Sequence, residues 1–587
     1  PYSFVSWYTR GVRKGAGSLL HLVRRGVEDH RTIGEYPLWL SGLLRTRGMD
    51  TVEKAERFLH PALEQLYPPL MMQDMDKAVT LLRQAIAAHQ PIMIYGDYDV
   101  DGVCATSIML ETLREEGAQV DYYIPSRHGE GYGLNCDAVR EIAKTHKLLL
   151  TVDCGVTNHE EVRLAQMLGM TVIVTDHHQL ADTPSPANAV LNPLLGDYPF
   201  RRLCGAGVAL KICQAMQGME GVKKRLELAA LATVADIVPL VGENRILAHY
   251  GLELLNRAPS KGLLSIIKIC GLNKHSITID DIVFKIGPRI NAAGRMRMDE
   301  NDENAAPSGG YAAVNLLVEN NESDAEDYGS IIDAFNQDRK SIDRHVTQEA
   351  HEIIESDPEL KNRKSTVIYN PRWMKGIVGI VASRLIETYF RPTVVLTQSN
   401  GFATGSARSV PGFDLYQAVE SCADLLENFG GHMYAAGLTM RPENVGEFTR
   451  RFNAYVEENI DPQMLVPQVD VDAELLFSEV TPAFRRELKR FEPFGPGNAA
   501  PIFATRSVSN RGDAKLVGAE CEHLRMDLTQ RQKPNTTLQC IAFQQPEHFE
   551  WIRSGRPVDV CYQIVENHYR GTVSTQLRIK DIKRVEK

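Results

Sequence analysis

The stretch Tyr95–Gly102 (YGDYDVDG) carries three carboxylates on alternate residues, and it decides the interpretation of the whole chain. It follows the apolar run Pro91–Ile94, which is typical of a buried strand bounded by Pro and Gly. At this spacing Asp97, Asp99 and Asp101 repel one another and raise one another's pKa unless a cation neutralises them. A divalent metal held by oxygen ligands is one explanation. An acidic turn that faces water is the other.

Two further apolar runs also end in residues that bind metals. Leu148–Val152 is followed by Asp153, and Met170–Thr175 is followed by Asp176-His177-His178. In open parallel α/β sheets, ligands bind outside the carboxyl ends of the strands, where the strand order reverses. A solvated turn explains one such strand end but not three. The sequence therefore favours a metal site at this edge of a sheet.

A further acid, Asp236, stands near the end of a predicted helix over Leu226–Val238. Its neighbours are Ala, Val and Ile, and burying an unpaired carboxylate among such residues is costly. A metal or a strong hydrogen-bond partner is therefore implied, and a structural ion pair is the alternative.

Bulk properties set the class of protein. A chain of 587 residues is too long for one core, so two to four domains are expected. Ten cysteines without a Cys-x-x-Cys pair argue against a zinc ribbon or a disulfide framework and favour the cytoplasm. No apolar run approaches the roughly 18 residues of a membrane span, so no membrane partner is expected. The net charge of −10 says little about nucleic acid, because phosphate binding depends on local fields.

Pattern changes along the chain predict an α/β protein with a β-rich end. Alternating strand and helix patterns indicate a doubly wound parallel sheet, and a long polar helix pattern at about 312–355 joins it to a second α/β lobe. Short strand patterns after about residue 461 fit a small closed barrel of the oligonucleotide-binding (OB) type, with a purely structural β domain as the alternative. The expected ranges are 1–90 (helical cap), 91–298 (parallel sheet), 299–356 (acidic loop and long helix), 357–460 (second lobe) and 461–587 (barrel).

Four Gly-rich or Ala-rich segments carry residues suited to phosphate or base binding. Each alone is weak evidence, and a plain flexible loop explains the first equally well. Ser406 and Arg408 are two residues apart, so in extended chain their side chains face the same way. The candidates are Arg127 and Tyr132 in 126–134, Arg289 and Arg295 in 287–295, Ser406 and Arg408 in 405–409, and His432 in 430–437.

Taken in order, these motifs resemble the DHH phosphoesterase superfamily. The resemblance rests on residues 96–102, 153–155, 176–178 and 235–236, while 406–408 and 430–432 look like the companion DHHA1-type substrate-binding domain. Residues 491–498 (FEPFGPGN) look like the entry to the OB-type barrel of the superfamily's single-strand-specific exonucleases. The similarity covers about residues 40–587. Two departures are Met374, where His is expected, and the acidic insert at 299–310.

The resemblance implies a single-strand-specific DNA exonuclease that digests from the 5′ end to mononucleotides in recombination and repair. It implies Mn²⁺ or Mg²⁺ as cofactor, with two ions expected for phosphodiester hydrolysis. Single-stranded DNA is the expected substrate, and a single-strand-binding protein and a helicase are expected partners. The alternative is a phosphodiesterase of short oligonucleotides or cyclic dinucleotides, against which the long C-terminal barrel argues.

Roles follow for the quoted residues. His178 is expected beside the scissile phosphate, as hydrogen-bond donor or general acid, with Asp176 orienting its neighbours. Adjacent histidines at a strand end are expected to point to opposite sides. Asp153 is the best candidate for a ligand shared between two ions. The expected metal ligands are Asp97, Asp99, Asp101, Asp153, His177 and Asp236; Arg127, Arg289, Arg295, Ser406, Arg408 and His432 are expected to hold phosphates, and Tyr132 to stack on a base.

Overall fold

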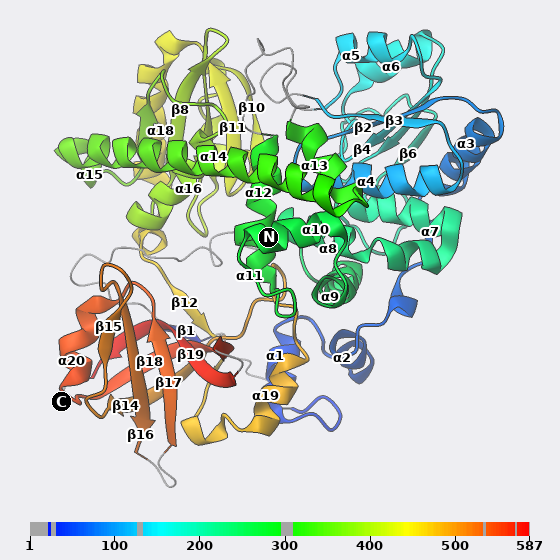
Figure 1. The fold of residues 1–587 in the computed structure, drawn as a ribbon. Helices are drawn as coiled ribbons and strands as arrows, with labels where there is room; N and C mark the ends of the chain where they lie inside the picture. Colours follow the sequence, from blue (N-terminus) through cyan, green and yellow to red (C-terminus); the bar gives the residue numbers. More distant parts are fainter. Residues whose placement is uncertain are drawn as a thin grey trace. The chain divides into compact units, whose positions relative to one another are not determined.

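The computed structural model describes residues 22–24, 31–125, 133–294, 309–531, 536–569 and 572–585 (Figure 1). Its contacts divide the chain into two compact units. The parallel-sheet unit comprises residues 56–340 and 491–499, and the barrel unit comprises 1–55, 341–490 and 500–587. The predicted sites Arg127, Tyr132 and Arg295 lie outside the described residues, as does most of the acidic insert.

Five parallel strands form the central sheet of the parallel-sheet unit, in the order β3-β2-β4-β5-β6. The first strand of this sheet along the chain, β2, thus lies inside the sheet, and the strand order reverses between β2 and β4. Apolar runs make the strands other than the edge strand β3, because a parallel sheet is covered on both faces. The strands are β2 (Ile92–Gly96), β3 (Val120–Tyr123), β4 (Leu148–Val152), β5 (Thr171–Thr175) and β6 (Ala189–Leu191).

Helices cover both faces of this sheet. Ile92 and Ile94 of β2 enter the core shared with α4 (Val100–Glu115), whereas Met93 and Tyr95 enter a second core. That second core includes residues of α5 (Cys136–Ile142) and α6 (His159–Met167). Figure 1 shows α5 and α6 on one side of the strands and α4 on the other. The predicted doubly wound sheet is confirmed.

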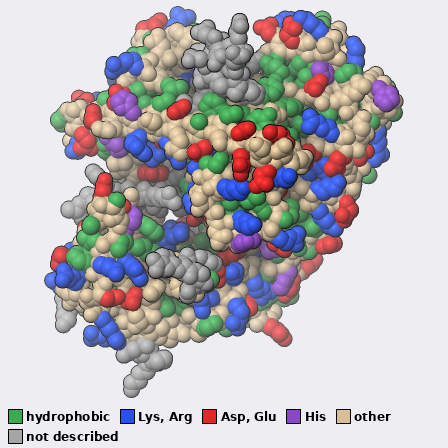
Figure 2. Space-filling view, in the orientation of Figure 1, with side chains coloured by type: hydrophobic (Ala, Val, Ile, Leu, Met, Phe, Trp, Pro, Cys, Tyr) green, Lys and Arg blue, Asp and Glu red, His purple; other side chains and the backbone are tan. Residues whose placement is uncertain are grey.

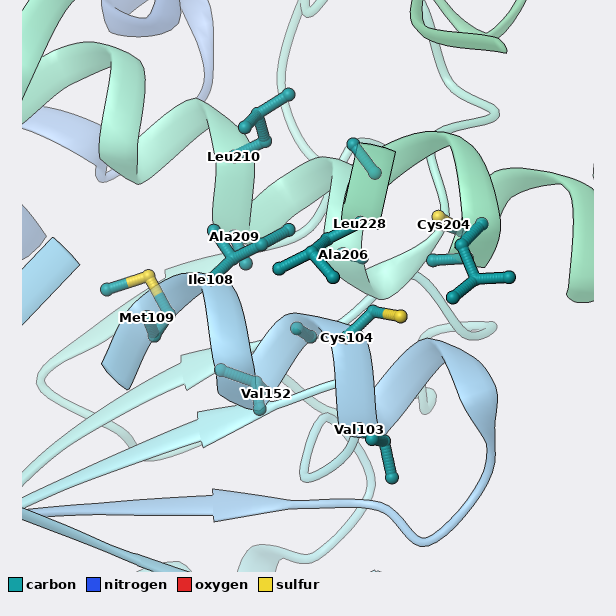
Figure 3. Close-up of a cluster of buried hydrophobic side chains, with 14 of the residues drawn as sticks. Val103, Cys104, Ile108, Met109, Val152, Cys204, Ala206, Ala209, Leu210 and Leu228 are labelled. Atoms are coloured by element: carbon teal, nitrogen blue, oxygen red, sulfur yellow. The ribbon is translucent and has the colours of Figure 1, made fainter. Parts of the chain in front are cut away.

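The helix α4 packs against α7 (Gly205–Lys224) and α8 (Leu226–Ala235) (Figure 3). This packing positions the acidic residues at the start of α4 and the end of α8. Cys104 and Ile108 of α4 lie beside Ala206 and Ala209 of α7, all fully buried. Small residues on α7 allow this close approach, and truncating a buried Ile such as Ile108 to Ala would cost about 2–5 kcal/mol. The close packing brings the first turn of α7 against the first turn of α4.

The remaining helices of this unit pack around the same core. A π-helical turn, η4, runs directly into α12. The helices are α2 (Val52–Leu59, shared between the units), α3 (Met75–Ala87), α9 (Gly242–Arg257), α10 (Lys261–Ile269), α11 (Ile279–Asp281), η4 (Ile282–Ile286), α12 (Gly287–Ala293) and α13 (Gly309–Val318).

The prediction of one long helix over about 312–355 is wrong in one respect. The structure has two helices here, α13 and α14 (Glu322–Ser356). The Glu319 carboxylate accepts hydrogen bonds from the backbone N–H groups of Asn320 and Asn321, at 2.8 Å each. The Asn321 side chain in turn accepts from Ser323 N at 2.9 Å. Such local side-chain bonds compete with helical ones and break the helix.

The second α/β lobe, within the barrel unit, holds a mixed sheet in the order β10-β11-β9-β8-β7, where only β7 and β8 pair in parallel. One face packs α14 and α16, and the other packs α17 and α18. The elements are α15 (Pro358–Asn362), β7 (Thr366–Tyr369), α16 (Val378–Tyr389), β8 (Thr393–Ser399), β9 (Phe402–Arg408), α17 (Leu415–Glu420), β10 (Leu426–His432), β11 (Ala435–Met440) and α18 (Val445–Asn459).

The C-terminal region is a closed five-stranded barrel, in which β14 pairs β18, then β19, β17 and β16 follow, and β16 pairs back to β14. This closure confirms the predicted OB-type barrel. The elements of this part, with those that accompany it, are α1 (Leu38–Arg45), β1 (Leu22–Arg24), β12 (Val469–Val471), β13 (Ala473–Glu474), α19 (Pro482–Lys489), β14 (Phe503–Asn510), β15 (Lys515–Val517), β16 (His523–Gln530), β17 (Thr536–Ala542), α20 (Phe549–Arg553), β18 (Val558–Tyr569) and β19 (Thr572–Arg584).

Surface charge is mixed in sign. Figure 2 shows Lys and Arg side chains interspersed with Asp and Glu over the face in view. Among the helices within the described ranges, none is both long and apolar enough to cross a membrane.

Candidate metal centre

The strand register brings the acidic motifs together. Gly96 of β2 is paired with Val152 of β4, and Val152 with Thr175 of β5. Asp97, Asp153 and Asp176 each follow one of these paired residues. The three acids therefore leave the sheet side by side, and the gap between β2 and β4 is the point where the strand order reverses.

The turn that carries the motif Tyr95–Gly102 is held by hydrogen bonds from its backbone to side chains. Asp99 caps α4, with its carboxylate accepting hydrogen bonds from the N–H groups of Asp101 (2.9 Å) and Gly102 (3.1 Å). The Asn291 side chain of α12 accepts from Val100 N at 3.1 Å. A Cβ at Gly102 would lie 2.5 Å from the Asp97 carbonyl oxygen, so only glycine allows this tight turn.

Asp101 meets the first turn of α7. Its two carboxylate oxygens accept hydrogen bonds from Gly205 N (2.6 Å) and Ala206 N (2.7 Å). Helix N-termini favour negative charge, so this contact stabilises the buried carboxylate. A Cβ at Gly205 would lie 2.5 Å from the Cβ of Asp153. Glycine at this position therefore lets Asp101 and Asp153 approach one another.

His177 lies at the centre of the carboxylates. Its Nε2 is 3.1 Å from Asp153 Oδ1, 3.6 Å from Asp101 Oδ2 and 3.8 Å from Asp236 Oδ2. Three overlapping groups have ligand atoms within 4.8 Å of one another, and Asp153 and His177 each belong to two of them. The groups are Asp153-His177-His178, Asp101-His177-Asp236 and Asp97-Asp99-Asp153.

Two residues of this cluster have backbone dihedral angles in the left-handed region, which is unfavourable for residues other than glycine. Asp153 has φ +61°, and Ile237, which follows Asp236, has φ +60°. For a β-branched residue such as Ile237 this conformation is sterically unfavourable. Strain of this kind concentrates at functional sites, where the surroundings impose it.

The electrostatics of the cluster suit a divalent cation. Burial, and then the charges of its acidic neighbours, raise the pKa of Asp153 well above its usual value, and the same causes raise the pKa of Asp236 and Asp99. Burial lowers the pKa of His177, which keeps a neutral ring nitrogen available as a ligand. Carboxylate oxygens with one neutral imidazole are a donor set for Mn²⁺ or Mg²⁺, whose charge offsets the repulsion. The donor set therefore fits the expected metal.

His178 and Asp176 form a separate pair at the rim. Asp176 Oδ1 is 2.7 Å from His178 Nδ1, and Oδ2 accepts from Val156 N at 3.0 Å. Burial opposes ionisation of both groups, but their hydrogen bond and opposite charges outweigh it, so the pKa of Asp176 is lowered and that of His178 is raised. The Asn192 amide donates to the His178 carbonyl at 3.0 Å, which fixes the backbone here.

The expectation that His177 and His178 point to opposite sides is wrong. Their ring centroids are 4.4 Å apart, with 54° between the planes. The strand β5 ends at Thr175, so the two-residue alternation of a strand no longer applies to the histidines. Their exposures differ nevertheless, because 45% of the His178 side chain is accessible and only 14% of the His177 side chain.

The candidate phosphate-binding residues lie in both units. Arg289 of α12, in the parallel-sheet unit, pairs with Asp333 at 2.8 Å and donates to the Lys285 carbonyl at 2.8 Å. A Cβ at Gly287, at the start of α12, would lie 3.5 Å from the Cβ of Ala235, so the helix packs beside the Asp236 region.

The second lobe brings its three candidates onto one sheet. Arg408 pairs with Ala435, which pairs with His432, so the three lie in one row across β9, β11 and β10. Arg408 Nη1 donates to Ser406 Oγ at 2.6 Å, which confirms that both side chains face the same way. A Cβ at Gly379, in the first turn of α16, would lie 3.3 Å from both side chains. Burial lowers the pKa of the Arg408 guanidinium.

Sequence patterns did not single out every residue that shapes the metal cluster. Asn291 and Asn192 hold the backbone at Val100 and His178, and Gly205 provides the approach to Asp153. Asn291 stands in a segment considered for its arginines, and Gly205-Ala206-Gly207 signals a helix start with small residues. Neither pattern reveals what its residue contacts.

Three family matches agree with this architecture. Residues 91–235 match the N-terminal domain of the DHH family, residues 362–458 the DHHA1 domain, and residues 471–581 the RecJ OB domain. Together with the acid–imidazole cluster at the strand-order reversal, they define a protein of the DHH class with a DHHA1 domain and an OB barrel.

Similar proteins make the assignment specific. The chain is 31% identical to the single-stranded-DNA-specific exonuclease RecJ of Haemophilus influenzae, over 96% of this chain and 99% of that protein. It is 36% identical to the protein of that name from Bacillus subtilis, over 92% and 67% of the two chains. A crystal structure of RecJ from Thermus thermophilus in complex with Mn²⁺ matches with a TM-score of 0.77 and 29% identity, covering 94% of this chain and 77% of that one. The chain belongs to the RecJ family, and the predicted resemblance is confirmed.

Proposed function

We propose that the protein is a single-stranded-DNA-specific exonuclease that hydrolyses phosphodiester bonds from the 5′ end, releases mononucleotides and serves recombination and repair in the cytoplasm. The observation that carries the proposal is the set of overlapping ligand groups around Asp153 and His177, at the strand-order reversal of a RecJ-family chain. A single-strand-binding protein and a helicase are proposed partners. The mixed surface charge is compatible with local phosphate sites.

The proposed domain limits are contiguous in the sequence, although residues 491–499 pack in the parallel-sheet unit. Each of the three family matches falls inside one of the proposed ranges, which supports them. The limits are 1–90 for a helical cap, 91–298 for the DHH domain, 299–356 for the acidic loop and connecting helix, 357–460 for the DHHA1 domain and 461–587 for the OB domain.

Two divalent ions, Mn²⁺ or Mg²⁺, are the proposed cofactors, and when bound they supply an activated water and neutralise charge on the transition state. Asp153 belongs to two ligand groups and its carboxylate has two oxygens, so it is the proposed shared ligand, whereas His177 is proposed to bind one ion through its ring nitrogen. Asp99 also caps α4 with one oxygen, so its other oxygen is the proposed donor. The ligand set is Asp97, Asp99, Asp101, Asp153, His177 and Asp236.

His178 is the proposed donor to the scissile phosphate. The bond between its Nδ1 and Asp176 orients the ring, and the same bond and charge raise the pKa of His178, which increases the protonated fraction of the imidazole. With Nδ1 bound to Asp176, the proton on Nε2 is the one that can be offered to a phosphate oxygen or a leaving group. Asp176 acts through this orientation, and its lowered pKa keeps it ionised.

The group of Ser406, Arg408 and His432, on neighbouring strands of one sheet, is the proposed site for the terminal phosphate of the strand. The first turn of α16 reaches this group at Gly379, and a helix N-terminus with a neighbouring guanidinium suits a phosphate. In the other unit, Arg127, Arg289 and Arg295 are proposed to hold backbone phosphates and Tyr132 to stack on a base, on the strength of the family resemblance.

The decisive experiment digests 5′- and 3′-labelled single and double strands with Mn²⁺, Mg²⁺ or chelator. Release of labelled mononucleotide from 5′-labelled single strands, absent in chelator, is expected. Asp153→Ala and His177→Ala should abolish release while the proteins stay folded, and Asp137→Ala, on the exposed surface of α5, is the matched control. Turnover that persists in chelator would overturn the metal mechanism. Faster turnover of a dinucleotide than of a long strand would favour the small-substrate alternative.

A further inference from the structure

The nine-residue segment Phe491–Ala499 belongs to the parallel-sheet unit, although the residues on both sides of it belong to the barrel unit. A buried arginine of α9, Arg245, holds the start of the segment. Its Nη1 donates to the Phe491 carbonyl at 2.7 Å, its Nη2 to the Glu492 carbonyl at 2.9 Å, and its Nε to the Phe58 carbonyl at 3.0 Å. The guanidinium also lies 4.1 Å from the centroid of the Phe58 ring.

Asn498 closes the segment into a loop. Its side-chain amide donates to the carbonyls of Phe491 (2.7 Å) and Pro493 (3.0 Å), and its backbone exchanges two 2.9 Å hydrogen bonds with Gly495. Both Asn498 and Phe491 are fully buried. Three carbonyl groups that would be costly to bury alone are thus satisfied by one guanidinium and one amide.

The tip of this loop packs on residues 239–241. The Pro496 carbonyl accepts a hydrogen bond from Leu240 N at 2.7 Å. A Cβ at Gly495 would lie 2.3 Å from Leu240 Cδ1, and a Cβ at Gly497, which has φ +72°, would lie 3.1 Å from Pro239 Cβ. Both glycines are needed for this approach, because side chains would push the two loops apart.

Residues 239–241 directly continue the loop that carries the metal-ligand candidate Asp236. The helix α8 ends at Ala235, Asp236 is its C-cap, and Ile237 takes the strained left-handed conformation. A carboxylate at a helix end needs support on both sides to keep its direction. The helix provides one side, and the Phe491–Asn498 loop, through Leu240, provides the other.

We propose that the Phe491–Asn498 loop positions the Asp236 carboxylate for metal binding, with Asn498 and Arg245 as positioning residues; the proposal rests on the metal centre proposed above. Groups that orient metal ligands typically change metal affinity about 10- to 100-fold when they are removed. The segment therefore does more than connect two domains, because it sets the affinity of the ion that Asp236 binds.

The test compares Asn498→Ala with Asn256→Ala in the full chain. Asn256 is a matched control, because its side chain also bridges two backbone groups, Ile277 N (2.6 Å) and Ile277 O (3.0 Å), away from residues 236–241. Mn²⁺ binding is followed by the electron paramagnetic resonance of the free ion, and unfolding by thermal melting. Asn498→Ala is expected to weaken Mn²⁺ binding about 10-fold or more, and Asn256→Ala to leave it unchanged at a similar loss of melting temperature.

A second variant tests the same loop without replacing a buried polar side chain. Gly497→Ala leaves the Asn498 side chain in the chain, but its φ of +72° disfavours alanine and its Cβ would lie 3.1 Å from Pro239 Cβ. It should therefore weaken Mn²⁺ binding in the same direction, and high Mn²⁺ concentration should restore turnover in both variants. Equal Mn²⁺ affinity in wild type and both loop variants would overturn the positioning role. Failure of the wild type itself to bind Mn²⁺ would instead overturn the proposed metal centre, so the two failures are distinguishable.

Discussion

Asp153→Asn should stabilise the ion-free protein and destabilise it in the presence of Mn²⁺. The ligand atoms of Asp97, Asp99 and Asp153 lie within 4.8 Å of one another, where two unit charges at an effective dielectric constant of 20 repel by about 3.5 kcal/mol. Removing the Asp153 charge relieves two such pairs, although proton uptake by the wild type reduces the gain to a few kcal/mol. Asparagine preserves volume and tolerates the φ of +61° at this position, so the backbone is spared.

The effect has a defined dependence on pH. Burial and acidic neighbours raise the pKa of Asp153, Asp236 and Asp99 in the folded protein above their values in the unfolded chain. A carboxyl group with a raised folded-state pKa costs nothing at low pH and destabilises the fold as pH rises through the interval between the two pKa values. The ion-free wild type should therefore lose stability as pH rises, and Asp153→Asn should lose less.

Thermal melting at pH 6 and pH 8, in chelator and in Mn²⁺, measures both effects. In chelator at pH 8 the variant should melt several degrees above wild type. Mn²⁺ at about 100 times its dissociation constant should stabilise wild type by about 2.7 kcal/mol and the variant far less, which reverses the order. A variant that melts below wild type in chelator at pH 8, or an order that does not reverse with Mn²⁺, would refute the reasoning.

Three further changes test other parts of the molecule. Burial raises the pKa of Glu227 to about 7, from 4.5 in the unfolded chain. Ionising Glu227 therefore costs about 3 kcal/mol of folding free energy above pH 7 and nothing below pH 4.5. Glu227→Gln should raise the melting temperature at pH 8 and change it little at pH 5. Arg408→Ala should raise KM for 5′-phosphorylated strands about 10- to 100-fold, from the loss of a charge-assisted bond, and spare kcat; an equal effect on 5′-hydroxyl strands would contradict the phosphate site. Gly205→Ala places a Cβ 2.5 Å from Asp153 Cβ, so Mn²⁺ affinity should fall sharply in a calorimetric titration, and unchanged affinity would show that the approach of α7 is not needed.

Local patterns predicted much of the metal centre. The apolar runs before Asp97, Asp153 and Asp176 specify buried parallel strands, and parallel strands end at one edge, so the convergence follows from periodicity alone. The apolar neighbours of Asp236 indicated a sheltered carboxylate, and in the structure its side chain is 26% accessible. The OB-type barrel followed from short strand patterns.

The rest depends on contacts between residues that are distant in the sequence. Asp101 is held by Gly205 and Ala206, about a hundred positions later, and no periodicity reports that pairing. The break at residues 319–321 arises from the Glu319 side chain, which accepts hydrogen bonds from the backbone N–H groups of Asn320 and Asn321, a competition that a polar helix pattern hides. The apolar run Met170–Thr175 did predict the end of β5, but not the turn that brings the rings of His177 and His178 together.

The split composition of the parallel-sheet unit has a consequence for biosynthesis. The ribosome completes the unit's main portion at residue 340 but delivers Phe491–Ala499 only after about 150 more residues, which at roughly 5–20 residues per second takes on the order of ten to thirty seconds. During that interval the nascent chain lacks the last piece that braces the Asp236 loop. The proposed positioning of Asp236 therefore requires residues that are synthesised well after the main part of their own unit.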